Sequence, residues 1–188
     1  EKRKVGKQIS HLALVLTAYL HTLEKYPALN RFIKGHNIYQ HKDIKVSMVV
    51  LKPDGSDTMS KIDLVPTDDV PQSLIDLTPF HASLLISNLA SIRTNHIYHH
   101  VYEFGTTSIA ITMGNMREVP RRTKDGIVFD RCMPLGVVMD ERIASGHYMA
   151  QAFAQIKKYL ADPRLMERES LDSEKAAEQS AEAAEKAE

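Results

Sequence analysis

The stretch Val137-Val138-Met139-Asp140-Glu141-Arg142-Ile143-Ala144-Ser145-Gly146 is the strongest candidate in the sequence for a functional junction between a buried strand and a helix. Apolar residues typical of a buried strand lead into charged residues, and a helical pattern follows the glycine. Functional side chains often lie where a strand ends beside the start of a helix, because the backbone is fixed there while the side chains reach a cleft. The same residues are also compatible with a plain turn whose charges are solvated.

Helices are predicted on both sides of a region of strands. Apolar residues at three- and four-residue spacing predict a helix over 7–25, ended by Pro27, and a second helix from Gly146 to the Asp162-Pro163 pair. Strands are predicted between them, over 44–51, 57–65, 83–87, 107–113, 126–131 and 133–140, with turns at Pro53-Asp54-Gly55 and Lys124-Asp125-Gly126. This order predicts an α+β fold, with a mixed sheet and helices packed on one face as a two-layer sandwich.

The composition of the chain excludes several classes of protein. Its 188 residues include 24 basic and 24 acidic side chains, which argues against a basic nucleic-acid binder and against an acidic disordered chain. No apolar run reaches the ~20 residues that a membrane span requires, and the single Cys132 cannot form an internal disulfide. We therefore expect a cytoplasmic domain over 1–172, without nucleic-acid or membrane partners, followed by a solvated Ala- and Glu-rich tail over 173–188.

Five short stretches between Tyr26 and Met166 occur in a specific order. They are Tyr26-Pro27-Ala28-Leu29-Asn30, Ile86-Ser87-Asn88-Leu89-Ala90, Ser108-Ile109-Ala110-Ile111-Thr112-Met113-Gly114, the hairpin over 124–138, and Asp140-Glu141-Arg142-Ile143-Ala144-Ser145-Gly146. Together they resemble the catalytic domain of the dihydrolipoamide acyltransferases of the 2-oxo acid dehydrogenase complexes, relatives of chloramphenicol acetyltransferase. The resemblance implies a chloramphenicol acetyltransferase-like fold and a homotrimer. Coenzyme A and the lipoyl group of a partner protein would meet at its subunit interfaces.

The resemblance also implies roles for three residues. In the family, a motif histidine takes the proton of the attacking thiol, and the serine matched by Ser87 hydrogen-bonds to the oxyanion. Here Glu141 stands in place of that histidine, and Ser145 stands in place of the motif aspartate, so the active site is degenerate. A carboxylate with a pKa near 4.3 lies about two units below an imidazole at about 6.5, so proton removal by Glu141 would cost roughly 3 kcal/mol more.

A substitute base could come from the stretch Asn95-His96-Ile97-Tyr98-His99-His100. His99 and His100 are the candidates, while the alternative is that these histidines hydrogen-bond at a strand edge or subunit contact. No metal is expected, because no cysteine or carboxylate cluster stands beside them. His81 and His147 are interpreted as packing or interface residues. The hairpin turn carries basic residues that are either solvated or in contact with the phosphates of coenzyme A, namely Arg117, Arg121, Arg122 and Lys124.

Two functions are compatible with this sequence. The first is an acyltransferase that moves an acyl group between coenzyme A and a thiol such as a dihydrolipoyl group. The second is a non-catalytic trimeric scaffold or an acyl-coenzyme A binding subunit. The family also has a further helix and strand upstream of Lys4 and a longer segment between Val70 and Pro71, so this chain is expected to lack both.

Overall fold

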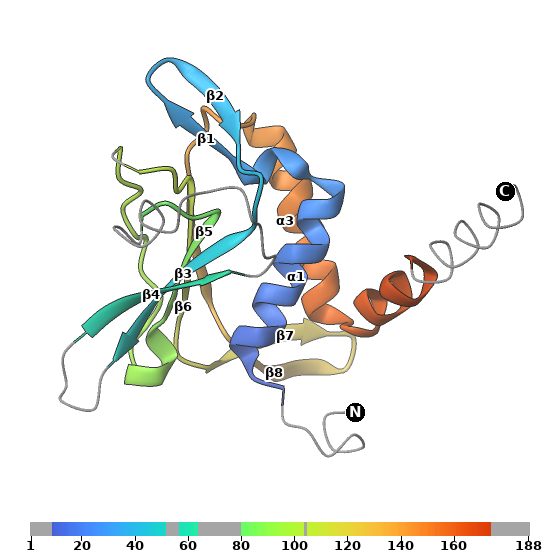
Figure 1. Ribbon diagram of the computed structural model, residues 1–188. Helices are drawn as coiled ribbons and strands as arrows, with labels where there is room; N and C mark the ends of the chain where they lie inside the picture. Colours follow the sequence, from blue (N-terminus) through green and yellow to red (C-terminus); the bar gives the residue numbers. More distant parts are fainter. Residues whose placement is uncertain (1–8, 52–56, 64–79, 104, 174–188) are drawn as a thin grey trace, which may run out of the picture. The chain divides into compact units, whose positions relative to one another are not determined.

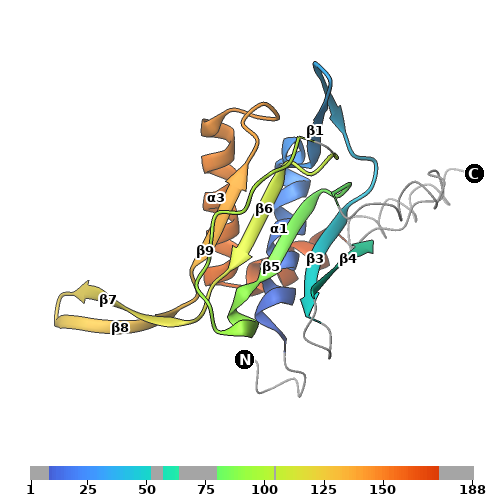
Figure 2. The ribbon, with the colours of Figure 1, turned by 90° about the vertical axis from the view of Figure 1, so that its left-hand side faces the viewer.

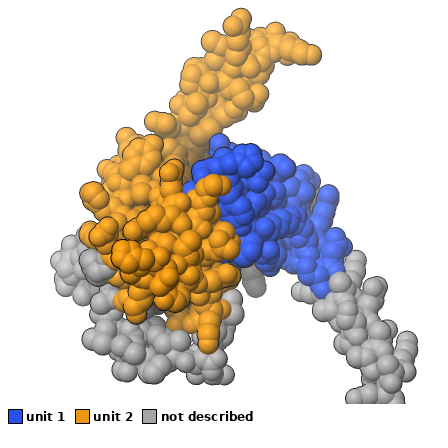
Figure 3. All heavy atoms as spheres, turned by 90° about the horizontal axis from the view of Figure 1, so that it is seen from above, with its two compact units in different colours: residues 1–27, 146–188 blue, residues 28–145 orange. Residues whose placement is uncertain are grey.

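The computed structural model describes residues 9–51, 57–63, 80–103 and 105–173 (Figure 1). The chain divides into two compact units, residues 1–27 with 146–188, and residues 28–145 (Figure 3). The predictions for the region upstream of Lys4, for the segment between Val70 and Pro71, and for the tail beyond Ser173 lie outside the described residues. Within the described ranges, no helix has the length and apolar character to cross a membrane.

The helical unit joins the two ends of the chain. Helix α1 spans His11–Lys25, α3 spans Gly146–Ala161, and a further helix runs over 164–173. Helices α1 and α3 pack against each other through residues spaced three or four apart, which confirms the two predicted helices. Their buried residues are Val15, Ala18, Tyr19, Thr22 and Leu23 in α1, and Met149, Ala152, Ile156 and Tyr159 in α3.

The start of the first helix differs from its predicted start at Lys7. It begins at His11, because the Ser10 side chain accepts a hydrogen bond from the backbone N of Ala13 at 3.0 Å and so caps the helix. Ile9, which the helical pattern placed on the apolar face, precedes this cap and is 52% exposed. The predicted boundary was therefore wrong at this end.

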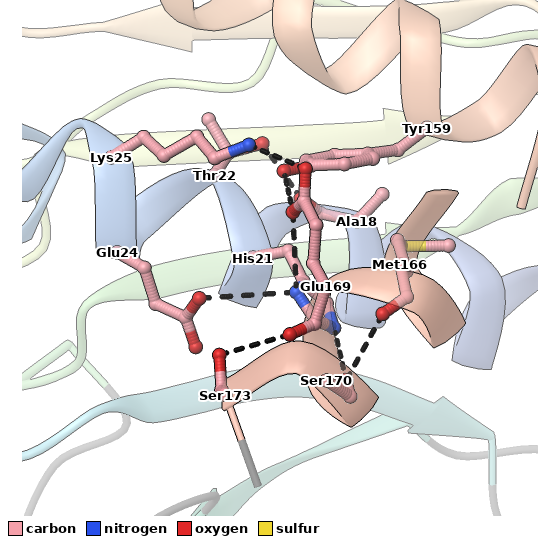
Figure 4. A network of polar contacts seen from close by, with 10 residues as sticks. All are labelled: Ala18, His21, Thr22, Glu24, Lys25, Tyr159, Met166, Glu169, Ser170 and Ser173. Atoms are coloured by element: carbon pink, nitrogen blue, oxygen red, sulfur yellow. Dashed lines mark hydrogen bonds and ion pairs between the residues drawn. The ribbon is translucent and has the colours of Figure 1, made fainter. Parts of the chain in front are cut away.

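A polar network fastens the helix over 164–173 to α1 and α3 (Figure 4). The Glu169 carboxylate accepts hydrogen bonds from Lys25 Nζ and from the Tyr159 hydroxyl, each at 2.6 Å. His21 Nδ1 lies 4.0 Å from Glu169 Oε2. Partial burial disfavours the charge on Glu169, but the bonds from Lys25 and Tyr159 outweigh it and hold the pKa of the carboxyl below its usual value. The ionised form of Glu169 is therefore the one that the fold stabilises.

The substitution Glu169→Gln is expected to remove both stability and a pH dependence. A carboxyl whose pKa is lowered by folding contributes stability above its unfolded pKa of about 4.3, and this contribution disappears as the pH falls through the folded value. At pH 7 we expect a loss of about 0.5 to 1 kcal/mol, because Lys25 and Glu169 are 43% and 35% exposed and water screens the pair.

Thermal unfolding of the unaltered protein and of Glu169→Gln, from pH 7 to pH 3, measures this difference in stability. The two stability curves should converge as the pH falls, whereas the exposed neighbouring change Glu167→Gln should leave the curve unaltered. Curves that stay parallel across the range would contradict the assignment to Glu169.

The second unit contains a five-stranded mixed sheet in the order β4-β3-β5-β6-β9, and Figure 2 shows these strands side by side. The parallel strands β3, β5 and β6 lie at its centre, and β4 and β9 run antiparallel at its two edges. The α+β class with a mixed sheet is thus confirmed, as is the predicted pairing of strands over 44–51 and 57–65. The strand bounds are Lys45–Leu51 (β3), Asp57–Asp63 (β4), Leu84–Asn88 (β5), Ile109–Met113 (β6) and Leu135–Met139 (β9).

The described residues also form two hairpins outside the five-stranded sheet and two short 3-10 helices. Strands β1 (Arg31–Lys34) and β2 (Asn37–Gln40) form a hairpin that was not predicted from the sequence. Strands β7 (Arg117–Thr123) and β8 (Gly126–Cys132) form the second hairpin, whose turn at Lys124-Asp125-Gly126 was predicted correctly. This ribbon extends away from the five-stranded sheet (Figure 2). The 3-10 helices are η1 (Pro27–Asn30) and η2 (Leu89–Ile92).

Candidate functional site

Ser87 lies near the carboxyl end of the central strand β5. It is 4% exposed, and in the parallel register of β5 and β6 it stands beside Thr112. The strand is hydrogen-bonded to β3 on one side and β6 on the other, so its backbone is held firmly. A cleft of about 290 Å³ opens at this strand end. It is lined by Val49, Ser87, Asn88, Leu89, Ser91, Ile92, Ile97 and His99.

The segment 93–103, which we call the histidine loop, lies tightly against the strands beside this cleft. The Thr112 hydroxyl accepts a hydrogen bond from the backbone N of Ile97 at 3.1 Å and donates one to the carbonyl oxygen of the same residue. A Cβ atom at Gly136 would overlap that carbonyl oxygen, and one at Gly114 would overlap the backbone N of His96. The two glycines and Thr112 therefore allow the loop backbone to approach the sheet closely.

This loop brings His99 to the cleft of Ser87. His99 is half-buried, and its Nδ1 lies 3.1 Å from the carbonyl oxygen of His100. A carbonyl oxygen only accepts hydrogen bonds, so the hydrogen of the neutral ring is on Nδ1 and the lone pair is on Nε2. The side chain of His100 lines a different, apolar cavity with Phe80 and Tyr102. Of the two histidines proposed as substitute bases, the structure brings His99 to the Ser87 cleft.

The cleft also holds a buried oxygen atom without a partner. Asn88 Oδ1 is buried and makes no hydrogen bond within the described part of the chain. A buried polar atom left unpaired costs roughly 1 to 3 kcal/mol. A bound molecule with an N–H or O–H group could remove this cost, so the cleft is suited to a ligand that carries a donor. Asn88 belongs to the same sequence motif as Ser87, but the resemblance implied a role for Ser87 alone.

Glu141 and Ser145 lie at the other end of the sheet. Strand β9 is antiparallel to β6, and the residue that follows it, Asp140, donates its backbone N–H to Ser108 O at 2.9 Å. Ser108 precedes Thr112 by four residues, which corresponds to about 13 Å at roughly 3.3 Å per residue. Glu141 and Ser145 are both exposed. A single chain therefore does not bring either residue together with Ser87.

The junction turn is stabilised by a pair within itself. The Asp140 carboxylate accepts hydrogen bonds from the backbone N of Arg142 at 3.0 Å and from its Nη2 at 2.6 Å. These bonds hold the pKa of Asp140 below its usual value. Arg142 also lines a cleft of about 340 Å³ together with Lys34, His81 and Glu103. The charges of Asp140 and Arg142 are thus paired with each other, and Arg142 also faces this second cleft.

The remaining candidate residues belong to other elements than the strand β5 that carries Ser87. His147 is exposed in the first turn of α3. On the β7–β8 hairpin, Arg121 is bound to Asp130 at 2.6 Å, whereas Arg122 and Lys124 line an open cleft of about 510 Å³. Within the described ranges, no group of three or more His, Cys, Asp or Glu side chains is arranged to hold a metal ion.

Comparisons with known proteins add to this geometry. Residues 81–167 match the family model of the 2-oxoacid dehydrogenases acyltransferase catalytic domain, which includes Ser87, the histidine loop and the junction. The cubic core of the pyruvate dehydrogenase multienzyme complex has the same fold, with a TM-score of 0.66 and 19% identity over 87% of this chain and 73% of that chain. The dihydrolipoamide acetyltransferase of Azotobacter vinelandii gives the same four values.

A probable dihydrolipoamide acetyltransferase from Listeria monocytogenes also matches, with a TM-score of 0.61 and 17% identity over 84% of this chain and 72% of that chain. No curated protein sequence matches the chain. The resemblance predicted from the sequence is thus confirmed, through the family model over residues 81–167 and through the fold of the acetyltransferase cores.

Proposed function

Because residues 81–167 match the acyltransferase catalytic domain, we propose that this protein transfers an acyl group between coenzyme A and a thiol such as a dihydrolipoyl group. The observation that carries the proposal is the cleft at the end of β5. It combines the Ser87 hydroxyl, the half-buried His99 and the unpaired Asn88 oxygen. These are a hydrogen-bond donor, a base and an acceptor for a bound molecule.

Acyl transfer between thiols requires stabilisation of a negatively charged oxygen. When a thiolate attacks a thioester, the carbonyl oxygen gains charge, and a hydrogen-bond donor fixed in a water-poor site stabilises it more than bulk water does. The Ser87 side chain forms no hydrogen bond to another described residue, so its hydroxyl is available for that oxygen. Because β5 is the central strand, this donor is preorganised.

An assembly of copies is part of the proposal. Exposed apolar side chains lie in this part of the chain, since Ile92 and Ile97 line the cleft, Tyr98 follows Ile97, and each of the three is at least half exposed. A second copy of the chain would cover the part of these side chains that faces away from the cleft, as the predicted homotrimer requires. In such a trimer the end of the sheet that carries Glu141 and Ser145 could approach the Ser87 cleft of the next copy. Arg122 and Lys124 on the hairpin are then candidates for the phosphates of coenzyme A.

The substitution Ser87→Ala tests the acyltransferase. With acetyl-coenzyme A and dihydrolipoamide, we expect kcat to fall about 100- to 1,000-fold while KM changes little, because the lost hydrogen bond forms mainly in the transition state. Ser108→Ala is the matched control. Ser108 is as buried as Ser87, but it precedes β6, whereas Ser87 lies beside Thr112 near the opposite end of that strand. Equal rates for Ser87→Ala and the unaltered protein would contradict the proposed role of Ser87.

A non-catalytic trimeric scaffold or acyl-coenzyme A binding subunit is the second candidate. It is favoured by the replacement of the family's histidine and aspartate by Glu141 and Ser145. This candidate predicts that no thiol acceptor gives turnover, although the protein sediments as a trimer and calorimetry detects binding of acetyl-coenzyme A. Turnover that depends on Ser87 would exclude it.

A further inference from the structure

We infer that His99 is the base of the acyl transfer and that it acts on a thiol held in the cleft of its own chain. This inference rests on the proposed function and deepens it. It assigns the proton transfer to a residue of the histidine loop instead of Glu141 at the junction. The site would then be complete, in its base and its oxyanion donor, within one copy of the chain.

The first support is the shared cleft. Ser87 and His99 both line it, and the carbonyl of His100 holds the His99 ring with the hydrogen on Nδ1. Nε2 therefore has the lone pair that a base requires, and a neutral imidazole lies closer in pKa to a thiol than a carboxylate does. Glu141 is exposed and stands about 13 Å along the sheet from the level of Ser87.

The second support is the way in which the loop is held. The backbone of Ile97, two residues before His99, is bound by the buried Thr112 hydroxyl and lies directly over Gly136. A further hydrogen bond joins Asn115 N to Thr94 O at 2.9 Å. A base has to be positioned within hydrogen-bond reach of the proton that it removes. These contacts fix the loop by its backbone on both sides of His96 and so limit the positions open to His99.

The third support is the complementarity of the cleft to a thiol on an amide-linked arm. Its apolar lining comes from Val49, Leu89, Ile92 and Ile97, which suits methylene groups. The unpaired Asn88 Oδ1 can accept a hydrogen bond from an amide N–H of such an arm. We therefore assign to Asn88 the binding of the arm and to His99 the activation of the thiol at its end.

The reaction balances without a further reactant. His99 Nε2 takes the proton of the acceptor thiol, and the thiolate sulfur forms a bond to the carbonyl carbon of the acyl thioester. Ser87 donates its hydrogen bond to the resulting oxyanion. The bond between that carbon and the sulfur of coenzyme A then breaks, and the imidazolium returns its proton to the departing thiolate. The products are the new thioester and free coenzyme A, and His99 is neutral again.

The experiment compares His99→Gln with His100→Gln in the full-length protein, with acetyl-coenzyme A and dihydrolipoamide. We expect kcat/KM to fall about 100- to 10,000-fold in His99→Gln, as is typical for loss of a general base, and to stay within twofold in His100→Gln. The His99 variant should also lose the acidic limb of the pH–rate profile. Added imidazole should restore part of the activity of His99→Ala but none in His100→Ala.

A series of acceptors keeps the test independent of small changes in folding. An acidic aryl thiol is ionised without a base, so the defect of His99→Gln should shrink with that acceptor, whereas a misfolded variant would be equally inactive with every thiol. Circular dichroism and thermal unfolding of both variants accompany the assay.

The outcomes separate this inference from the proposed function. If Glu141→Gln loses the acidic limb and His99→Gln keeps it, the base comes from the junction; this inference is then overturned while the acyltransferase stands. A defect in His99→Gln that is the same for all thiols also overturns the inference. If the unaltered protein gives no turnover with any acceptor, the proposed function fails and the inference fails with it.

Discussion

Alanine at Gly136 is expected to abolish most of the acyl transfer although it adds one methyl group outside the cleft. Gly136 lies on β9, where a Cβ would overlap the carbonyl oxygen of Ile97 and come within 2.7 Å of Thr112 Oγ1. Neither neighbour can shift at a small cost in free energy, because one is a backbone atom and the other is a buried side chain bound to that backbone. The histidine loop must therefore move away from the sheet.

The expected size of this effect is large for activity and moderate for stability. A displacement of about 1 Å of a catalytic group can cost roughly 100-fold in rate, and we expect at least that loss in kcat. Overpacking at a tight contact costs typically about 1 to 3 kcal/mol. Steady-state kinetics and urea unfolding measure the two quantities separately.

Gly35→Ala is the matched control for Gly136→Ala. Gly35 has a φ of 62° but no atom within 4 Å of the position of a Cβ, so its substitution strains the β1–β2 turn alone. Both variants should lose stability, but only Gly136→Ala should lose acyl-transfer activity. Full kcat in Gly136→Ala would mean that the position of the histidine loop does not matter for the reaction.

Truncation of Ile86 is expected to give the largest loss of stability among the substitutions considered. Ile86 is fully buried on the central strand β5, paired with Met48 of β3 and Ile111 of β6, and adjacent to Ser87. Strands on both sides restrict collapse around the vacated space. Ile86→Ala should therefore lower the free energy of unfolding by about 2 to 5 kcal/mol, as is typical when a buried isoleucine is reduced to alanine.

Ile127→Ala provides the comparison, because Ile127 is 67% exposed on β8. The same loss of atoms at this position should change the stability by less than about 0.5 kcal/mol. Urea denaturation followed by far-UV circular dichroism measures both variants. A loss below about 1 kcal/mol in Ile86→Ala would be inconsistent with a tightly packed sheet centre.

The central strands could be predicted from the sequence because their environment leaves a simple pattern. Strands buried on both faces are almost continuously apolar, as in Leu84-Leu85-Ile86 and in Ile109-Ala110-Ile111. The β1–β2 hairpin escaped prediction for the opposite reason. Its strands have only four residues each, β1 is mostly half-buried and β2 is exposed, so neither alternation nor an apolar run marks them, and Gly35 is a local signal of their turn alone.

The candidate site could be predicted in part. A motif marked Ser87 and Glu141, but a motif contains no information on strand direction, and the antiparallel pairing of β9 with β6 separates the two residues along the sheet. The stretch with His99 and His100 was also visible in the sequence. Which of the two would face Ser87 depends on the anchoring of Ile97 by Thr112 and Gly136, contacts between residues far apart in the chain.

The helical unit has a consequence for the order of events during synthesis. Its two halves come from opposite ends of the chain, and the Lys25–Glu169 bond joins residues 144 positions apart. Helix α1 leaves the ribosome before α3 and cannot acquire this partner until residues 26–145 between them have been made. An amphipathic helix alone is marginally stable in water. Nascent chains therefore pass through a long interval in which the apolar face of α1 is uncovered, and such contacts of large sequence separation slow folding.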